Sequence, residues 1–463
     1  MLALTLGEIA DAVAGTLHGD PGLVVDGAAY LDSRAGVPGG LFVAVVGEHV
    51  DGHQYAAGAH AVLGSRPTEA PTVVVADPVT ALGRLARHVV DRLDATVIAL
   101  TGSQGKTGSK DYLAQVLAAA GSTVATIGNH NNELGVPLTV LAADPDTRYL
   151  VVEMGARGVG HIAYLCEIAP PQVAAVINVG TAHLGEFGSR EAIAQAKGEI
   201  VEALPQDGPA VLNADDGLVA AMRDRTSAAV LTFGAAGEVT ARGVELDDLG
   251  RPSFELGRAG EWHPVRLRLS GTHQVENALA AAAMALAVGV PLGEVAAALT
   301  ASASASPMRM ELHERPDGLV VVNDAYNANP ASVRAALDAL VSIGARRSAR
   351  TVAVLGVMLE LGAAHDDEHA DVGRYAAQRG VDVVVAVGPD AAPIAAGAAA
   401  VPQWEGTTVT LVGRDEALAW VRKNAAAGDV VLVKASRGAA LESVADGLLG
   451  PTDAQPEGEE GSR

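Results

Sequence analysis

A glycine-rich turn carries the clearest chemical signal in the sequence. The turn follows the apolar run 97–101, precedes the helix-like segment 109–120, and reads Thr101-Gly102-Ser103-Gln104-Gly105-Lys106-Thr107-Gly108. Glycines let backbone N–H groups wrap an anion, and the start of a helix directs partial positive charge toward it. In such a turn the lysine reaches the β- and γ-phosphates and the threonine hydroxyl binds Mg²⁺. Leu100 replaces the first glycine of the usual pattern. Strand, lysine and threonine are nevertheless all present, so the turn predicts a nucleoside triphosphate site.

Three further side chains could complete such a site. Glu153 ends the apolar strand 149–153, at the rim where open parallel sheets bind ligands, and its oxygens suit a hard cation. A strand-end glutamate alone is more often a solvated cap, but the phosphate loop favours metal binding. His183 follows the strand 173–179 in the same relation, where a structural and a functional histidine are equally plausible. Lys197 lies in a helical pattern, in which a lysine is by default a surface residue.

The scarcity of lysine argues against that default. The chain has five lysines, at positions 106, 110, 197, 423 and 434, and uses arginine for nearly every other positive charge. Arginine stays protonated, whereas a buried lysine loses its proton readily and can act as a nucleophile. Each lysine is therefore a better candidate than usual for chemistry that arginine cannot perform.

The order of apolar runs predicts an α/β protein. Strand-like runs alternate with Ala- and Leu-rich helical segments from residue 97 onward and again from 318 onward, as in parallel sheets covered by helices on both faces. We predict domains at 1–94, 95–312 and 313–451, and a disordered tail at 452–463. The Gly-rich segment 228–270 predicts an antiparallel appendage, and the Ala/Ser-rich segment 301–307 a hinge.

Composition narrows the function classes. The 463 residues include 55 acidic and 32 basic side chains, a net charge of −23, which argues against a surface that coats nucleic acid. The single cysteine, Cys166, excludes an internal disulfide framework and fits a reducing compartment. No uncharged apolar run of 18 residues occurs, so we expect no membrane span and a cytoplasmic location.

These residues resemble the Mur ligases, the ATP-dependent ligases of peptidoglycan precursor synthesis, over almost the whole chain. The phosphate loop Thr-Gly-x-x-Gly-Lys-Thr matches residues 101–107. Two longer stretches resemble the family members that add D-alanyl-D-alanine, namely Asn129-His130-Asn131-Asn132-Glu133-Leu134-Gly135-Val136-Pro137 and Asn323-Asp324-Ala325-Tyr326-Asn327-Ala328-Asn329-Pro330.

The resemblance implies a fold and a set of ligands. The fold would have a small N-terminal α/β domain for the UDP-sugar, a central P-loop ATPase domain and a C-terminal Rossmann-like domain. The cofactors would be ATP and Mg²⁺, and Lys197 would be carbamylated. The partners would be UDP-N-acetylmuramoyl-tripeptide (UDP-MurNAc-tripeptide) and D-alanyl-D-alanine, and we expect a monomer. The product would be the UDP-MurNAc-pentapeptide precursor of peptidoglycan, made through an acyl phosphate, with ADP and phosphate.

The resemblance also implies roles for single residues. The catalytic set would be Lys106, His183, Lys197 and Arg309. ATP would contact residues 102–108, Asn277 on the adenine side, Arg309 at the γ-phosphate and Asp324 at the ribose. The metal would be held by Thr107, Glu153, His183 and the carbamate of Lys197, and the other substrates by Ser33, Arg34, Asn131, Asn132, Tyr326 and Asn327.

Two other functions fit parts of the pattern. One is a related amide-forming ligase, either another Mur ligase or a folylpolyglutamate synthase-like enzyme. The stretches at 129–132 and 324–327 argue against it. The other is a nucleotide-switched binding protein, which would not need Glu153, His183 and Lys197 together.

Overall fold

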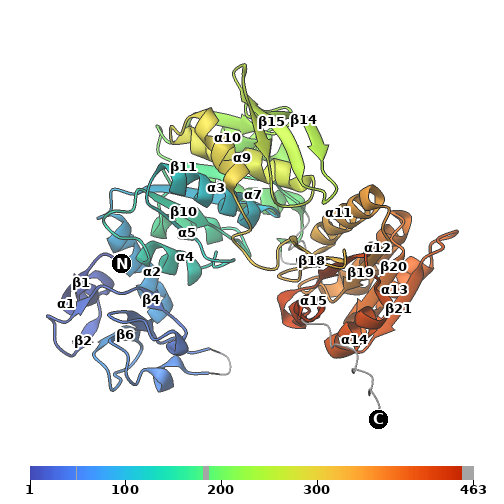
Figure 1. Ribbon diagram of the computed structural model, residues 1–463. Coiled ribbons are helices and arrows are strands. Elements are labelled where there is room, and N and C mark those ends of the chain that lie inside the picture. Colours follow the sequence, from blue (N-terminus) through green and yellow to red (C-terminus); the bar gives the residue numbers. More distant parts are fainter. Residues whose placement is uncertain (48–49, 181–186, 451–463) are drawn as a thin grey trace, which may run out of the picture.

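The computed structural model describes residues 1–47, 50–180 and 187–450. It contains three units, each built around its own sheet (Figure 1). The first unit holds the order β2-β7-β6-β5-β4 and a β1–β3 pair. Its strands are β1 (Leu4–Thr5), β2 (Thr16–His18), β3 (Val24–Val25), β4 (Ala29–Tyr30), β5 (Leu41–Val43), β6 (Ala61–Gly64) and β7 (Thr72–Val74). Its helices are α1 (Leu6–Val13) and α2 (Pro78–Val90).

The central unit is a six-stranded parallel sheet in the order β13-β12-β11-β8-β10-β9. Its strands are β8 (Thr96–Thr101), β9 (Thr123–Ala125), β10 (Tyr149–Glu153), β11 (Val173–Val176), β12 (Ala210–Asn213) and β13 (Val230–Phe233). Five of the six residues of β8 are buried, because helices cover both of its faces. β8 therefore carries its loop into the middle of the sheet's carboxyl edge.

Different helices cover the two faces of this sheet. α3 (Lys106–Ala120), α9 (His273–Ala287) and α10 (Leu292–Ala301) form one layer. α4 (Gly135–Leu141), α5 (His161–Ile168) and α7 (Arg190–Glu202) form the other, and this second core continues into the first unit. α8 (Gly217–Ala220) follows β12. No helix in the described ranges has the length and apolar character needed to cross a bilayer.

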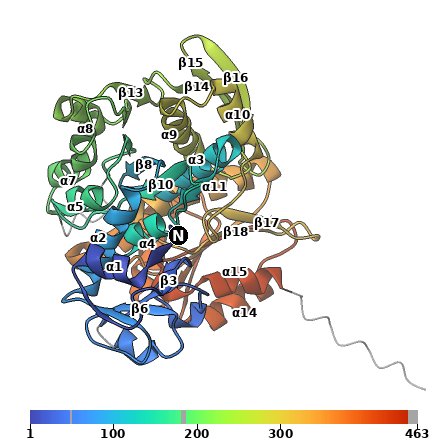
Figure 2. The same cartoon turned by 90° about the vertical axis from the view of Figure 1, so that its left-hand side faces the viewer.

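A separate antiparallel sheet of three strands packs on α9 and α10 and projects from the top of the central unit (Figures 1 and 2). Its strands are β14 (Thr240–Leu246), β15 (Pro252–Arg258) and β16 (Glu261–Arg266). The predicted appendage at 228–270 is confirmed for 240–266. Its start was wrong, because β13 pairs in parallel with β12 and so extends the main sheet.

The third unit is a sheet in the order β17-β18-β22-β19-β20-β21, parallel except for β17. Its strands are β17 (Glu311–Glu314), β18 (Val320–Asp324), β19 (Thr351–Leu355), β20 (Val383–Val387), β21 (Thr407–Leu411) and β22 (Val430–Lys434). Its helices are α11 (Pro330–Arg347), α12 (His365–Gln378), α13 (Ala392–Ala399), α14 (Arg414–Asn424) and α15 (Glu442–Leu449). A buried core lies on each face.

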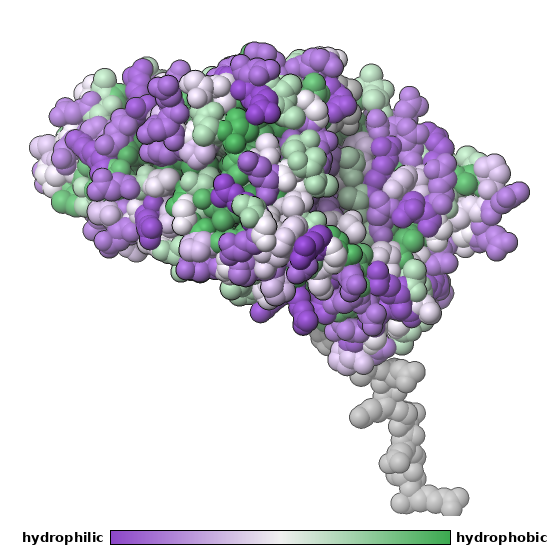
Figure 3. Space-filling view, turned by 90° about the horizontal axis from the view of Figure 1, so that it is seen from above, coloured by the Kyte–Doolittle hydropathy of each residue, from purple (hydrophilic) through white to green (hydrophobic). Residues whose placement is uncertain are grey.

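The segment 302–310 joins α10 to β17 and is the covalent link between the central and third units (Figure 1). Hydrophilic side chains are spread across the surface of the molecule seen from above, with small hydrophobic groups between them (Figure 3). The α/β class and the three-unit fold predicted from the sequence are confirmed.

Candidate functional site

The glycine-rich turn joins β8 to α3 and leaves the start of the helix open. Gly105 is the residue before the first helical turn, with φ of 73°, and no side chain caps the helix. A Cβ at Gly105 would lie 2.5 Å from Asn277 Oδ1, and one at Gly108 would lie 2.7 Å from Asn277 Nδ2. Glycine is therefore required at both positions, and the first N–H groups of α3 remain available to an anion.

The segment after β11 holds this turn in place. Ser103 N donates to Asn178 O at 3.1 Å, and Gln104 N donates to Asn178 Oδ1 at 2.9 Å. Gly180 N in turn donates to Ser103 Oγ at 2.9 Å. The loop conformation is thus fixed from outside the loop, which leaves its own inner N–H groups directed at the cavity.

Lys106 lies at the mouth of the turn. Its Nζ donates to Gly102 O at 2.7 Å, and it forms no ion pair with any residue in the described ranges. Burial lowers the pKa of Lys106, the nearby Glu153 carboxylate raises it, and Arg309 lowers it further. Two cationic side chains from different units therefore converge on the place where the turn would hold phosphates.

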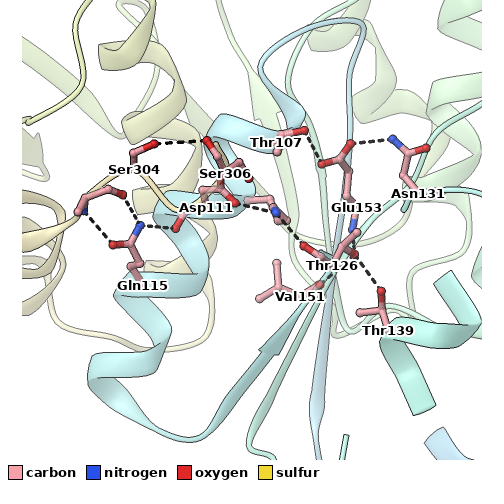
Figure 4. Close-up of polar contacts among 12 residues, drawn as sticks. Thr107, Asp111, Gln115, Thr126, Asn131, Thr139, Val151, Glu153, Ser304 and Ser306 are labelled. Atoms are coloured by element: carbon pink, nitrogen blue, oxygen red, sulfur yellow. Dashed lines mark hydrogen bonds and ion pairs between the residues drawn. The ribbon is translucent and has the colours of Figure 1, made fainter. Parts of the chain in front are cut away.

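Glu153 is buried at the end of β10, with both carboxylate oxygens occupied (Figure 4). Oε2 accepts from Thr107 Oγ1 at 2.9 Å, and Oε1 accepts from Asn131 Nδ2 at 2.7 Å. The Glu153 backbone N donates to Thr126 Oγ1 at 3.0 Å. The carboxylate thus lies beside the threonine hydroxyl, an oxygen pair of the kind that Mg²⁺ prefers.

The structure gives the two predicted asparagines distinct positions. Asn131 orients Glu153. Asn132 Oδ1 accepts from the backbone of Leu134 at 3.3 Å and of Gly135 at 3.0 Å, at the start of α4. Both asparagines also line the cavity described below, so each can contact a bound ligand as well as the protein.

Lys197 projects from α7 into the same cavity. It is 5% exposed, and its amine has no hydrogen-bond or ion-pair partner in residues 1–47, 50–180 and 187–450. Burial, together with the charge of Lys106, holds its pKa well below the ordinary value. A buried, readily deprotonated amine that lines the same cavity as Glu153 fits a lysine that reacts with CO₂, because the resulting carbamate would supply an oxygen ligand.

The described residues include only some of the predicted metal ligands. His183 lies outside the described residues. Among the residues that are described, no group of three or more His, Cys, Asp or Glu is placed to hold a metal ion. The donor chemistry of Thr107, Glu153 and a carbamate on Lys197 nevertheless fits Mg²⁺, which takes oxygen ligands.

The opposite wall of the site comes from the third unit. The Arg309 guanidinium lies over the Tyr326 ring at 4.2 Å, and its buried Nε has no hydrogen-bond partner among the described residues. Tyr326 OH donates to Asn129 Oδ1 of the central unit at 2.5 Å. Lys434 Nζ donates to Asp324 Oδ2 at 2.6 Å. Lys434 also donates to Asn327 O at 2.8 Å.

Together the two walls enclose a cavity of about 750 Å³. It is lined by the predicted residues 103–108, Asn131, Asn132, Glu153, Lys197, Asn277, Arg309, Asp324, Tyr326 and Asn327. Asn277, predicted on the adenine side, lies on α9 against the phosphate loop. His273 on the same helix also lines the cavity, and burial lowers its pKa while Asp324 opposes the shift.

Three predicted residues in the described ranges do not line this cavity, namely Gly102 at the start of the turn and Ser33 and Arg34 in the first unit. Ser33 begins the 3₁₀ turn Ser33–Ala35 of the first unit, and Arg34 forms an exposed ion pair with Asp32 at 2.6 Å. Any role of these two residues is therefore played at a separate surface of the first unit.

Lys110 and Asn129 take part in the site, although neither was predicted as a site residue from the sequence. Lys110 is buried on α3, and its Nζ donates to Thr126 O at 2.7 Å, next to the hydroxyl that holds Glu153 N. The rarity of lysine was the available signal. Of the five lysines, only Lys423 is exposed, and the others lie in the cavity or in the network behind Glu153.

Comparisons with known proteins agree along the chain. Residues 100–285 match the Mur ligase middle domain, and residues 308–437 match the Mur ligase glutamate ligase domain. The UDP-N-acetylmuramoyl-tripeptide–D-alanyl-D-alanine ligase of Mycobacterium bovis is 44% identical, covering 97% of this chain and 98% of that protein. The enzyme of the same name from Escherichia coli K12 is 36% identical, covering 97% and 99%.

Solved structures show the same likeness. A crystal structure of MurF from Acinetobacter baumannii superposes with a TM-score of 0.85 at 33% identity, covering 97% of this chain and 99% of that chain. The structure of MurF from Thermotoga maritima in complex with ADP has a TM-score of 0.76 at 30% identity, covering 90% and 96%.

Proposed function

The chain belongs to the Mur ligase family, and we propose that it is the ATP-dependent ligase that joins D-alanyl-D-alanine to UDP-MurNAc-tripeptide. The product is the UDP-MurNAc-pentapeptide precursor of peptidoglycan, with ADP and phosphate. The observation that carries the proposal is one cavity in which the phosphate loop, Glu153 and Lys197 face Arg309 and Asp324 of another unit.

The first step activates a carboxylate. The terminal carboxylate of the tripeptide attacks the γ-phosphorus of ATP, a P–O bond breaks, and ADP leaves with its electron pair. The product is an acyl phosphate. Such a transfer depends on in-line positioning and on neutralisation of phosphate charge. Lys106 and Arg309 supply positive charge from two sides, and the open N-terminus of α3 binds the phosphates.

The metal position follows from the donors that are present. Thr107, Glu153 and carbamylated Lys197 would hold Mg²⁺, together with His183, which lies outside the described residues. The ion would neutralise charge on the phosphate oxygens. The carbamate forms when the neutral Lys197 amine attacks CO₂ and loses a proton, which turns a cation into an anionic oxygen ligand.

The second step forms the amide. The amine of D-alanyl-D-alanine attacks the acyl carbon, the C–O bond to phosphate breaks, and phosphate leaves while the amine loses a proton. Water would hydrolyse the acyl phosphate, so closure of the third unit over the site has a chemical purpose. The hydrogen bond from Tyr326 of the third unit to Asn129 of the central unit supports such a closed arrangement.

We also propose which substrate each part of the chain binds. We assign the UDP-sugar to residues 1–94, with Ser33 and Arg34 as contacts, ATP to 95–312, and closure to 313–451. Asn131, Asn132, Tyr326 and Asn327 face the remaining substrates, Asn277 the adenine side and Asp324 the ribose. We propose a monomer in the cytoplasm, and light scattering of the purified chain checks the monomer.

The decisive assay measures phosphate release with matched omissions. We expect turnover only when ATP, UDP-MurNAc-tripeptide and D-alanyl-D-alanine are all present, with a new amide detected by mass. Turnover with glutamate and a folate, or with a different amino acid in place of the dipeptide, would contradict the proposal. ATP binding without any amide product would favour a nucleotide-switched binding protein.

The carbamate has its own test. Lys197→Ala should lose activity, and short-chain carboxylic acids should restore part of it by placing a carboxylate where the carbamate stood. Lys423→Ala, a change of the exposed lysine, is the matched control and should keep wild-type turnover. Full activity of the Lys197 variant in CO₂-depleted buffer would remove the carbamate from the proposal.

A further inference from the structure

A glutamine on α3 holds the link between the central and third units. Gln115 Nε2 donates to Ala303 O at 3.0 Å, and Gln115 Oε1 accepts from Ala303 N at 2.9 Å (Figure 4). Nε2 also donates to Asp111 O, one turn earlier on the same helix, at 3.0 Å. The side-chain amide thus pairs with both polar groups of one backbone residue, as a neighbouring β-strand would.

The other end of the link belongs to the third unit. Tyr326 N donates to Met308 O at 3.2 Å, and Met308 N donates to Glu311 Oε2 at 3.1 Å. Met310 N donates to Asp324 Oδ1 at 3.1 Å. Met308 and Met310 both have positive φ, at 59° and 50°, a backbone conformation that residues other than glycine rarely adopt. The strained backbone is therefore held in place by the third unit.

These two anchor points confine the pivot to four residues, Ser304, Ala305, Ser306 and Pro307. Only one internal side-chain bond is found there, from Ser304 Oγ to Ser306 O at 3.3 Å. Without the Gln115 bonds, the free segment would extend back to Ser302, the C-cap of α10, whose N donates to Ala298 O at 2.9 Å. Gln115 therefore sets where the pivot begins.

The same helix carries both the anchor and the phosphate loop. Lys106 begins α3 and Gln115 lies nine residues later, a rise of about 14 Å along a rigid rod. Arg309 follows Met308, the first residue after the pivot, and lies over Tyr326 in the cavity. The position of Arg309 relative to the phosphate loop is consequently fixed through α3, Gln115, the four residues of the pivot and Met308.

We propose that Gln115 is a positioning residue for the reaction: by anchoring Ala303 to α3, it fixes the pivot about which the third unit brings Arg309 to the nucleotide. This inference rests on the proposed function, since it takes Arg309 to face the γ-phosphate. Gln115 itself does not line the cavity and touches no reacting group. Replacing Gln115 should therefore affect closure of the third unit and leave the affinity for ADP unchanged.

The first measurement is hydrogen exchange of the free protein. In Gln115→Ala, exchange at Ala303 N should become about tenfold faster, because that group loses one hydrogen bond of ordinary net strength, whereas Ser302 N keeps its bond to Ala298 O. Gln115→Glu keeps an acceptor for Ala303 N and loses the donor to Ala303 O, so an intermediate rate is expected. Gln378→Ala changes an exposed glutamine of α12 and serves as the matched control. Unchanged exchange at Ala303 would overturn the anchor.

The second measurement separates positioning from a general loss of structure. Gln115→Ala should lower kcat by about tenfold and weaken binding of a non-hydrolysable ATP analogue, while the Kd for ADP stays within about twofold of wild type. Equal losses for ADP and the ATP analogue, or a wild-type kcat with fast exchange at Ala303, would overturn the positioning role. Thermal unfolding and Gln115→Glu guard against a folding defect in the alanine variant.

Failure of the proposed function would be recognised separately. If the wild-type chain does not join the dipeptide to the tripeptide, the function fails whatever Gln115 does. The exchange rates and the ratio of ATP-analogue to ADP affinity would still decide between an anchor that positions Arg309 and one that does not.

Discussion

Two turns each lead from the carboxyl end of a strand in a large sheet into a helix, and the starts of the two helices differ. The turn after β8 leads into α3 through Gly105, with no side-chain cap. The turn after β18 leads into α11 through Asn329, whose Oδ1 accepts from Ser332 N at 2.8 Å while Ser332 Oγ accepts from Asn329 N at 3.0 Å. One helix start is open to an anion, and the other is closed by its own residues.

The lysines at the two turns differ in the same way as the helix starts: one has no carboxylate partner among the described residues, and the other is paired within the protein. Lys106 bonds only a backbone carbonyl within the described part of the chain, whereas Lys434 is buried against the carboxylate of Asp324 at 2.6 Å. The first turn has unsatisfied groups for a ligand to meet, and the second has satisfied its own. We therefore expect changes in the first turn to reduce activity, and loss of the Asp324 carboxylate or of the Asn329 cap in the second to reduce stability.

The largest expected effect comes from Lys106→Ala. Loss of the phosphate-facing ammonium should lower phosphate release by about 10³-fold, the scale seen when one preorganised charge-stabilising donor is removed. The free energy of unfolding should not fall, because Lys106 has no carboxylate partner in the residues that the structure describes. Lys423→Ala is the control in both assays. A Lys106 variant that loses stability as much as activity would break the comparison.

Asp324→Asn tests the second turn. It leaves the buried Lys434 ammonium without its counter-charge, so the free energy of unfolding of the third unit should fall by about 3 kcal/mol in urea titrations. Asp371→Asn, which breaks a half-exposed pair with Arg374 on α12, should change it by about 0.5 kcal/mol at most. Equal effects of the two changes would show that burial of the Asp324 pair is unimportant.

The contrast between the turns also explains what the sequence could reveal. The strands were predictable because apolar runs such as 97–101, 149–153 and 351–355 are buried on both faces, which leaves a continuous apolar signal. The phosphate loop was predictable because its chemistry is local: glycines, a lysine and a threonine lie within eight positions. The start of α3 at Lys106, ahead of the predicted 109, follows from the open cap.

The pairings across distance were not predictable. Gln115 meets Ala303, 188 positions away, and Tyr326 meets Asn129, 197 positions away. Neither residue type is unusual on a helix or in a loop. The packing of α10 beside α3 brings the first pair together, and the approach of the third unit to the central unit brings the second pair together. The strand β13 was misplaced for a related reason, since the five-residue run before a Gly-rich stretch suits a hairpin as well as a parallel edge.

Gly105→Ala tests the shape of the first turn. The new Cβ would lie 2.5 Å from Asn277 Oδ1 on a backbone with φ of 73°, so we expect about 2 kcal/mol of lost transition-state stabilisation, or about 30-fold in kcat/KM. Gly380→Ala meets the same backbone conformation, at φ of 80°, with no atom within 4 Å. Steady-state kinetics of both variants isolate the collision with Asn277. A normal kcat/KM for the Gly105 variant would mean that the loop can adopt another shape.

The smallest expected effect comes from the cap of α11. Asn329→Ala removes the Oδ1 acceptor of Ser332 N, while the bond from the backbone N of residue 329 to Ser332 Oγ remains, and it should lower the stability of the third unit by about 1 kcal/mol, with kcat close to wild type. Asn329→Asp keeps an acceptor for Ser332 N and should recover most of that stability. Urea titration and turnover are measured on the same preparations. Asn329 also lines the cavity, so a loss of activity as large as that of Gly105→Ala would show that Asn329 itself contacts a substrate.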